Sequence, residues 1–427
     1  MIQEQTKKCL MPILKLLSIC LLICSISKQG KAQINTGIKY DPKKVPNYLK
    51  DYADDYKKNP RVAALKWMKD AKYGMFMHYG VYSQTGKGEW VMWQEKIHVK
   101  EYTKLIDTFD PSNFDADAIT DLALDAGMKY ICITTKHHDS FCLWDTQETD
   151  FKSTNAKGNR DLIKDLAIKC NEKGIGLFFY YSYGRDWRHP HGVSLSKGGT
   201  EKLRGSYPEY DTPEPTYLRG TKDHDVQKYV SYVNNQVKEL LTYYGPIAAI
   251  WFDGPPDVQH NFDVFKPYKT YDMIHKLQPQ CLVSAKWGLK DPNDKHSFEE
   301  DFFAPEVKQY KSYMQSAGKP IEICMNFNTG WAWKAEYRNK GTDFIKESFK
   351  VCNYVNSNLL LNVAPMPDGA IHAEDQKALR EVGSWLKENG WPKERIDPNG
   401  NFRHWREGEA VFSDNEYKPM KYWFEKE

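Results

Sequence analysis

Apolar runs of strand length alternate with amphipathic segments about seven times along this chain of 427 residues. A run that is apolar on both faces is typical of a strand covered on both sides, as in parallel sheets. Parallel neighbours need long crossover connections, which are usually helices. The alternation therefore predicts an α/β fold, and a distorted (β/α)8 barrel of the TIM type fits best. A doubly wound open sheet is the second possibility, but the chain lacks a glycine-rich phosphate loop.

The pattern places the individual elements. The expected strands are Tyr73–Tyr79, Lys129–Thr135, Ile175–Tyr181, Ala248–Phe252, Cys281–Lys286, Ile321–Phe327 and Asn358–Val363. The expected helices are Arg61–Lys69, Asp115–Ala126, Arg160–Glu172, Asp225–Tyr243, Pro267–Leu277, Asp343–Val355 and Glu374–Asn389. A long polar loop over residues 185–222 has no periodicity, and such loops usually belong to a functional site.

The amino-terminal residues have the pattern of an export signal. Lys7 and Lys8 precede an apolar stretch, and small residues follow up to Ala32. We expect residues 1–32 to be a signal peptide cut after Ala32, and the mature protein to be periplasmic or secreted, without a membrane span. Lipidation at Cys20 or Cys24 is a weaker alternative. Residues 33–395 would form the catalytic barrel, and residues 396–427 a short tail with a possible hairpin.

Composition narrows the class of partner. The formal net charge of +3 is small for this length and argues against nucleic acid. Aromatic residues make up 14% of the chain, and several tryptophans fall in turns, which favours a carbohydrate ligand. Six cysteines beyond the signal have neither zinc-site nor disulfide-scaffold spacing, so most are expected to be buried as small apolar residues. A single structural disulfide among these six cysteines is the alternative.

Asp253 is the first candidate for a catalytic residue. It ends the apolar run Ala248–Phe252 and is followed by Gly254, which breaks the chain. The carboxyl ends of parallel strands are where ligands bind in barrels. Trp251 and Phe252 would form an aromatic wall that tunes the pKa of the acid. We interpret Asp253 as a nucleophile, although an isolated Asp-Gly is more often a turn cap.

Polar groups follow most of the other expected strands. They are His78, Lys136 to Asp139, Tyr180 to Ser182, Asp186 with Trp187, Lys286 with Trp287, and Asn362. His137 and His138 could be read as metal ligands. Adjacent residues of a strand point to opposite faces, however, and no metal-binding motif accompanies them. We therefore expect one histidine to bind a substrate hydroxyl and the other to support the sheet, with no metal and no cofactor.

A nucleophilic carboxylate that attacks a sugar needs a protonated partner about 5 Å away if the anomeric configuration is retained. Glu306 follows the apolar Phe302-Phe303-Ala304-Pro305, which would desolvate it and raise its pKa. We predict Glu306 as the acid/base. Glu299 and Glu300 are the next candidates, and all of these acids could instead be exposed surface residues.

Taken together, the motifs resemble the α-L-fucosidases of glycoside hydrolase family 29. The resemblance spans roughly Trp67 to Trp391. The motifs that carry it are Lys72–Gly80, Gly88–Val91, Lys136–Phe141, Trp251–Gly254 and Leu359–Pro365.

The resemblance implies a distorted barrel and a retaining double displacement, with Asp253 as nucleophile and Glu306 as acid/base. It also implies fucose-binding roles, which fall on His78, Glu89, Trp90, His137, His138, Tyr181 and Trp251. Three positions depart from the family pattern: Ser140 replaces a usual Gly, Lys286 a usual Arg, and Asn356-Ser357 a usual Gly-Gly. Lys286 would keep a positive charge in the site without bidentate geometry. We expect the family's C-terminal β-sandwich to be absent or strongly reduced.

The leading hypothesis is an exported exo-glycosidase that removes terminal α-L-fucosyl groups from glycans. The alternatives are a carbohydrate-binding relative without catalysis, a retaining glycosidase for a fucose-like sugar such as α-L-galactose, and a metal-dependent hydrolase that uses His137 and His138. The intact pair Asp253 and Glu306 argues against loss of catalysis, because a binding protein needs neither group.

Overall fold

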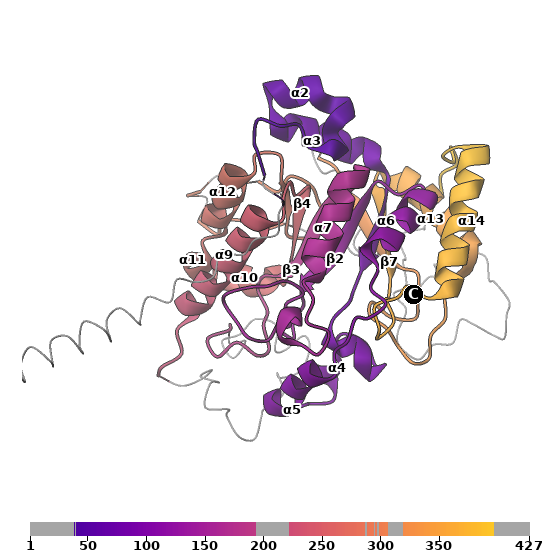
Figure 1. Cartoon of the computed structure of the whole chain (residues 1–427). Coiled ribbons are helices and arrows are strands. Elements are labelled where there is room, and N and C mark those ends of the chain that lie inside the picture. Colours follow the sequence, from indigo (N-terminus) through magenta and orange to yellow (C-terminus); the bar gives the residue numbers. More distant parts are fainter. Residues whose placement is uncertain are drawn as a thin grey trace, which may run out of the picture. The chain divides into compact units, whose positions relative to one another are not determined.

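Seven strands form one parallel sheet in this computed structural model (Figure 1). The structure describes residues 38, 40–193, 222–286, 288–293, 295–296, 299–305 and 319–396. In chain order the strands are β1 (Tyr73–Met77), β2 (Tyr130–Lys136), β3 (Gly176–Ser182), β4 (Ala249–Asp253), β5 (Leu282–Ser284), β6 (Glu322–Asn326) and β7 (Asn358–Val363). They lie in the order β5-β4-β3-β2-β1-β7-β6. All the predicted strands are present, with ends shifted by a few residues.

An irregular segment, residues 301–304, joins the two edges of this sheet. On one side the Asp301 N–H donates to a carbonyl of β5 at 2.9 Å. On the other side Phe303 forms backbone hydrogen bonds of 3.0 and 2.8 Å at the start of β6. The segment therefore takes the place of an eighth strand, and the prediction of a distorted (β/α)8 barrel is confirmed.

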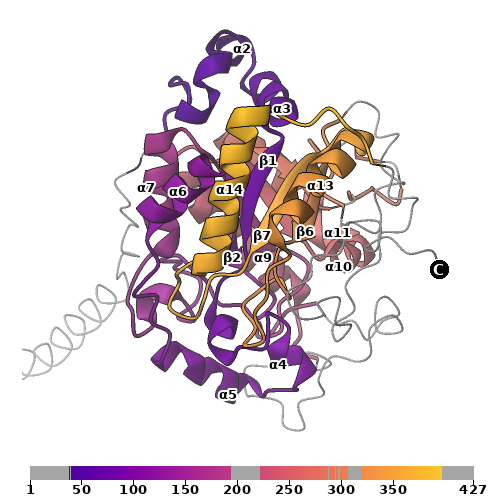
Figure 2. The ribbon, with the colours of Figure 1, turned by 90° about the vertical axis from the view of Figure 1, so that its right-hand side faces the viewer.

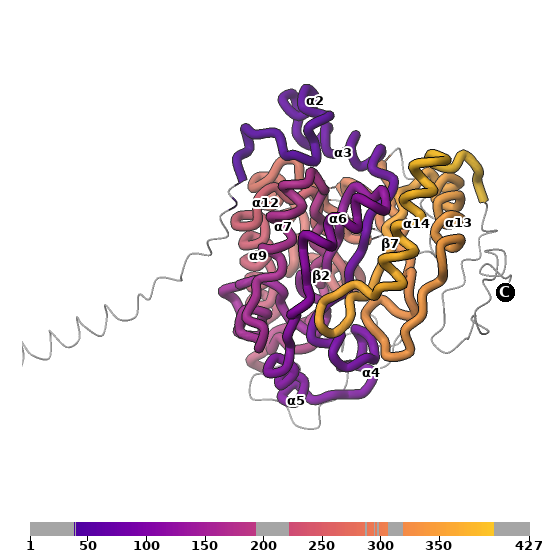
Figure 3. The backbone as a smooth tube through the Cα atoms, turned by 45° about the vertical axis from the view of Figure 1, so that its right-hand side comes forward, coloured from indigo at the N-terminus to yellow at the C-terminus, as the bar shows by residue number. Residues whose placement is uncertain are grey.

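Helices cover the outside of the barrel (Figures 2 and 3). The main ones are α3 (Pro60–Ala71), α6 (Ala116–Asp125), α7 (Leu162–Lys173), α9 (Val226–Tyr243), α12 (Pro267–Leu277), α13 (Gly341–Val355) and α14 (Ala373–Asn389). Asp115, Asp161 and Asp225 cap three of them, each accepting from a first-turn N–H. All the predicted helices are present. The three capping aspartates mark where α6, α7 and α9 begin.

Shorter helices lie at the two ends of the barrel. In Figure 1, α2 (Ala53–Lys58) and α3 lie across the amino ends of the strands, and α4 (Val91–Gln94) and α5 (Val99–Thr103) lie at the carboxyl ends. The short helices α10 (Pro255–His260) and α11 (Phe262–Phe265) follow β4. None of these except α3 was predicted, because helices of four to six residues are too short to show helical periodicity in a sequence.

Large aromatic side chains fill the barrel interior, and two glycines make room for them. A Cβ on Gly176 would lie 2.5 Å from the Trp67 ring of α3, and one on Gly74 would lie 2.4 Å from the Tyr130 ring. Trp67 contacts Tyr130 and Phe178 edge-on, with ring centroids 6.1 Å apart in both pairs. The amino end of the barrel is therefore closed by packed rings, and only the carboxyl end is left for a ligand.

The six cysteines of the described residues are buried and form no disulfide. Within the same residues, no helix is long and apolar enough to cross a membrane. The predicted signal peptide over 1–32 and the possible hairpin over 396–427 lie outside the described residues, apart from residue 396.

The close approach of α14 to α6 generates a stability prediction. A Cβ on Gly383 would lie 1.7 Å from the carbonyl oxygen of Asp125. Alanine normally stabilises a helix relative to glycine, but here the clash is with backbone that cannot rotate away. We expect Gly383→Ala to lower the free energy of unfolding by about 1–3 kcal/mol, measured by urea denaturation. The neighbouring exposed Ser384→Ala is the control, and a stabilised Gly383→Ala would contradict the packing described.

Candidate active site

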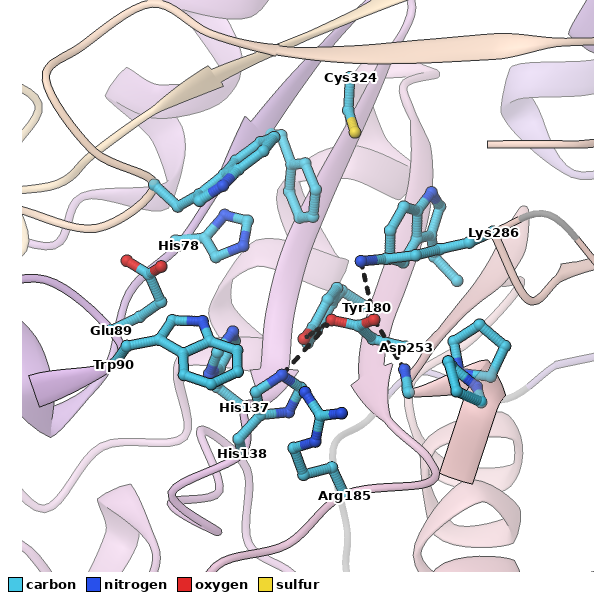
Figure 4. Close-up of a pocket in the computed structure, with 16 residues that line it drawn as sticks. His78, Glu89, Trp90, His137, His138, Tyr180, Arg185, Asp253, Lys286 and Cys324 are labelled. Atoms are coloured by element: carbon cyan, nitrogen blue, oxygen red, sulfur yellow. Dashed lines mark hydrogen bonds and ion pairs between the residues drawn. The ribbon is translucent and has the colours of Figure 1, made fainter. Parts of the chain in front are cut away.

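A cavity of about 260 Å³ lies at the carboxyl ends of the strands (Figure 4). It combines aromatic rings with two acids, two bases and three histidines. Its lining residues within the described chain are Phe76, His78, Glu89, Trp90, His137, His138, Tyr180, Arg185, Trp251, Asp253, Gly254, Pro255, Pro256, Lys286, Cys324 and Trp331. Of the ten predicted site residues, eight line this cavity.

Asp253 lies where three polar side chains converge, as Figure 4 shows. Lys286 Nζ is 2.9 Å from its Oδ1, and the Tyr180 hydroxyl donates to its Oδ2 at 2.7 Å. His138 Nε2 is 3.6 Å from the same Oδ2. The position follows from the end of β4, because the turn at Gly254 leaves the carboxylate at the rim of the cavity.

These contacts keep the acid ionised. Burial alone would raise the pKa of Asp253, but Lys286, His138 and Tyr180 together hold that pKa well below its ordinary value. Burial and the neighbouring imidazoles and cations hold the pKa values of His137 and His138 well below the usual range. At neutral pH the cavity therefore contains an anionic Asp253, which suits a nucleophile flanked by hydrogen-bonding groups.

Both histidines after β2 face the cavity, which corrects the expectation that one of them would support the sheet. Their rings lie 4.3 Å apart, and His137 stacks on Tyr180 at 5.4 Å. His138 Nδ1 is 2.5 Å from Ser182 Oγ. The alternation of a strand does not apply to them, because β2 ends at Lys136 and the chain turns at the histidines.

His78 and Glu89 form the opposite wall. His78 Nδ1 is 2.7 Å from Asn362 Oδ1 at the end of β7, which orients the imidazole. Glu89 accepts from the backbone N–H of Ala332 at 3.1 Å, in the loop that carries Trp331. Trp331 lies against His78 with ring centroids 5.2 Å apart. This wall is therefore built by β1, β7 and the loop after β6.

Trp90 and Arg185 cover another part of the cavity. The Arg185 guanidinium lies 5.5 Å from the centroid of Trp90 and pairs with buried Asp257 of α10 at 2.8 Å. Trp90 also contacts the edges of His138 and Trp187. A cation held over an indole in this way is rigid, so Arg185 can offer fixed N–H donors to a ligand.

Trp251 forms the floor and is supported from inside the barrel. Its indole stacks on Tyr180 at 5.4 Å, with Lys286 Nζ 5.5 Å from its centroid. Below it, the indole N–H donates to Glu322 Oε1 at 3.2 Å, and Glu322 is fully buried. Burial raises the pKa of Glu322 to about 7.

Tyr181 was predicted as a substrate-binding residue, and the structure corrects this. Its hydroxyl donates to Gln236 of α9 at 2.6 Å, on the outside of the barrel. Tyr180 is the residue of β3 that lines the cavity. Side chains alternate along a strand, so the prediction selected the wrong member of the pair.

The predicted acid/base Glu306 lies outside the described residues. The structure does place the two alternatives, and neither lines the cavity. Glu299 is exposed and pairs with Lys319 at 2.9 Å. Glu300 is buried behind the loop after β5, where it accepts from Tyr271 and from the N–H groups of Ala285 and Leu289. Glu300 therefore holds the loop of Lys286 in place and has no access to a ligand.

Sequence reasoning missed several lining residues, namely Phe76, Arg185, Cys324 and Trp331, and it named Tyr180 only as one of the polar groups at a strand end. Phe76 and Cys324 come from strand interiors, where a lining residue and a core residue look alike. Arg185 belongs to the long loop that was predicted to serve a site, and Trp331 lies between an expected strand and an expected helix. No group of three His, Cys, Asp or Glu side chains that could hold a metal occurs in the described part of the chain.

A barrel whose carboxyl end holds an ionised carboxylate between aromatic walls suits a protein that acts on carbohydrates. The family model described as α-L-fucosidase matches residues 42–391. The chain therefore belongs to the α-L-fucosidase family.

Individual relatives agree with this membership. The structure is similar to that of α-L-fucosidase isoenzyme 1 from Paenibacillus thiaminolyticus, with 34% identity and a TM-score of 0.67 over 78% of this chain and 77% of that one. It is also similar to an α-L-fucosidase from Lactobacillus casei, with 27% identity and a TM-score of 0.64 over 76% of this chain and 98% of that one. An α-L-fucosidase from Arabidopsis thaliana is 26% identical over 351 residues, or 75% of this chain. The chain matches only 59% of the length of that plant relative.

The buried carboxyl of Glu322 leads to a pH prediction. Between the ordinary Glu pKa of about 4.3 and the raised value, the folded protein holds one proton more on Glu322 than the unfolded chain. That proton stabilises the fold at low pH, and the stabilisation is lost as the pH rises towards 7. We expect Glu322→Gln, which mimics the neutral acid, to gain stability relative to the natural protein by roughly 1 kcal/mol per pH unit across this window.

Urea denaturation at several pH values measures this difference. Glu299→Gln is the matched control, because the pKa of exposed Glu299 is lowered by Lys319 and the group does not titrate in that window. Parallel stability curves for the natural protein and Glu322→Gln would show that Glu322 is ionised in the fold.

Proposed function

We propose that this protein is an exo-α-L-fucosidase that hydrolyses terminal α-L-fucosyl groups with retention of anomeric configuration. The observation that carries the proposal is the ionised Asp253, held by Lys286 and Tyr180 at the rim of a small cavity in a chain of the α-L-fucosidase family. A cavity closed on the barrel side admits the end of a glycan and not its middle, which supports exo action.

In the proposed reaction, an Asp253 oxygen attacks the anomeric carbon and the glycosidic bond breaks. Glu306 donates its proton to the departing oxygen, and a covalent fucosyl-Asp253 ester forms. A water molecule then attacks the same carbon and gives its proton to Glu306, which releases fucose and regenerates Asp253. Two inversions at one carbon give net retention.

The remaining cavity groups would bind the sugar. We assign hydroxyl recognition to His78, Glu89, His137 and His138, whose polar atoms border the cavity. Lys286 would balance the negative charge of Asp253 before attack and stabilise it again on departure. Lining side chains such as Trp90, Trp251 and Phe76 offer apolar surface to the C–H faces and the methyl group of fucose.

Complexes of a relative support the proposed substrate class. The Lactobacillus casei α-L-fucosidase is described in complexes with 4-nitrophenyl α-L-fucopyranoside and with fucose α-1,6-linked to N-acetylglucosamine. We propose fucosylated glycans of this kind as substrates for this chain.

Export through residues 1–32 is part of the proposal. It rests on the basic, apolar and small-residue pattern of that stretch. Amino-terminal sequencing of the protein produced in its native cell should begin at Gln33. Recovery of the intact amino terminus from the cytoplasm would contradict export.

The two carboxyl groups are tested by substitution. Asp253→Asn should lower kcat for 4-nitrophenyl α-L-fucoside by on the order of 1,000-fold or more, because the amide cannot form the ester. When the natural protein hydrolyses the substrate, NMR should show that the fucose first released is the α-anomer. Glu299→Gln, an exposed acid in the same region, should keep full activity.

Glu306→Ala separates the two steps in the same assays. Nitrophenolate leaves without a proton, so hydrolysis of the disaccharide should fall far more than hydrolysis of the aryl fucoside. Equal losses would remove Glu306 as the acid. Undiminished turnover by Asp253→Asn would remove the nucleophile, and fucose binding without hydrolysis by the natural protein would indicate a binding protein.

A further inference from the structure

A fully buried ion pair lies behind the cavity and takes no direct part in it. Lys136 Nζ is 2.9 Å from Asp186 Oδ2, and both side chains have no solvent exposure. Neither residue lines the cavity. Lys136 ends β2, and Asp186 lies four residues beyond the end of β3. The pair therefore joins the loops that follow two neighbouring strands.

The surroundings of Lys136 are aromatic. Its ammonium group lies 4.7, 5.6 and 5.3 Å from the ring centroids of Tyr181, Tyr229 and Tyr232, respectively. These rings stabilise a cation but leave room for few hydrogen bonds, so Asp186 is its main anionic partner. The register of β2 against β3 shifts between Thr134 and Lys136, which directs Lys136 outward while His137 and His138 face the cavity.

Asp186 also accepts hydrogen bonds from residues near it in the fold. Its Oδ2 also accepts from Ser140 Oγ at 3.0 Å, and its Oδ1 accepts the N–H groups of Arg188 and His189 at 3.0 and 2.7 Å. Burial would raise the pKa of Asp186, but Lys136 and these donors hold it below the ordinary value. The carboxylate thus fixes the turn after Asp186 and ties it to the loop of the two histidines.

Each residue of the pair is next in sequence to a residue of the cavity. Lys136 precedes His137, and Asp186 follows Arg185. The next residue, Trp187, donates its backbone N–H to the His138 carbonyl at 2.7 Å and packs against the His138 ring at 5.4 Å. Ser182 Oγ contacts both His138 Nδ1 and the Arg185 carbonyl, each at 2.5 Å. A shift of the pair would therefore move His138 and Arg185 together.

Stability alone does not explain such a pair. Two fully buried charges lose their hydration, and apolar residues of similar volume often serve a fold equally well or better. What apolar residues cannot reproduce is a directional link between two loops.

We propose that Lys136 and Asp186 are positioning residues that set His138 and Arg185 around Asp253. The proposal rests on the proposed fucosidase function for its kinetic readout. Its site is separate from the groups that touch the sugar.

Three variants test it: Asp186→Asn, Lys136→Met, and the double variant Lys136→Met/Asp186→Asn. Asp186→Asn leaves an unpaired buried cation and loses stability, whereas the double variant removes both charges and should recover a melting temperature near that of the natural protein. We expect kcat/KM for 4-nitrophenyl α-L-fucoside to fall on the order of 100-fold in the double variant despite this recovery. The acid limb of its pH profile should move to higher pH, because His138 no longer lies beside Asp253.

Asp161→Asn is the matched control. Asp161 is a largely buried carboxylate that caps α7 and accepts from Tyr244, away from the cavity. This variant should keep both kcat/KM and the acid limb. A double variant with natural kcat/KM and an unmoved acid limb would overturn the positioning role.

The natural protein decides the proposed function separately. If it fails to hydrolyse the aryl fucoside, that function is wrong, and the positioning role is then measured by calorimetric binding of L-fucose. A tenfold or greater loss of affinity in the double variant, with no loss in Asp161→Asn, would still support the pair, and equal affinities would overturn it.

Discussion

The surrounding structure has to keep one carboxylate, that of Asp253, ionised at the carboxyl end of the barrel. Asp253 remains an anion there because Lys286, Tyr180 and His138 outweigh the cost of its burial. Each of these three partners comes from a different strand end or loop. The geometry of the cavity therefore depends on how accurately the barrel brings these strand ends together.

Lys286, one of the three partners of Asp253, lies next to the irregular part of the barrel. Residues 301–304 replace a regular eighth strand, and buried Glu300 just before them accepts the N–H groups of Ala285 and Leu289. Lys286, between those two residues, has a positive φ of 52°. Glu300, next to the irregular segment, thus also holds the loop that carries the cation beside Asp253.

Departures from the family pattern have a backbone explanation. Ser140 and Asn356 stand where glycine is usual, and their φ values are 74° and 54°, in the left-handed region that glycine adopts without strain. Asn tolerates this region, and Ser140 is compensated by its hydrogen bond to Asp186. Both positions therefore adopt a backbone conformation that favours glycine while carrying other residues.

Most of the fold and part of the site could be predicted from the chain. Periodicity located the strands and longer helices because burial on one or two faces leaves a local pattern, and Asp253 could be predicted from its place at a strand end. Periodicity could not show that both His137 and His138 face inward, because that depends on where β2 ends. It also misplaced Tyr181, since neighbouring tyrosines in a doubly covered strand are equally apolar.

The sequence by itself determined the order of strands and helices, the nucleophile candidate and the family. Only the tertiary structure decided which residues share the cavity, that Glu299 and Glu300 do not, and that Lys136 and Asp186 meet behind it. The physical reason is the distance along the chain between the residues that interact. Secondary structure is encoded by neighbours along the chain, whereas the buried ion pair joins residues 50 positions apart and the cavity joins Tyr180 to Asp253, which are 73 positions apart. These contacts exist only after the barrel closes.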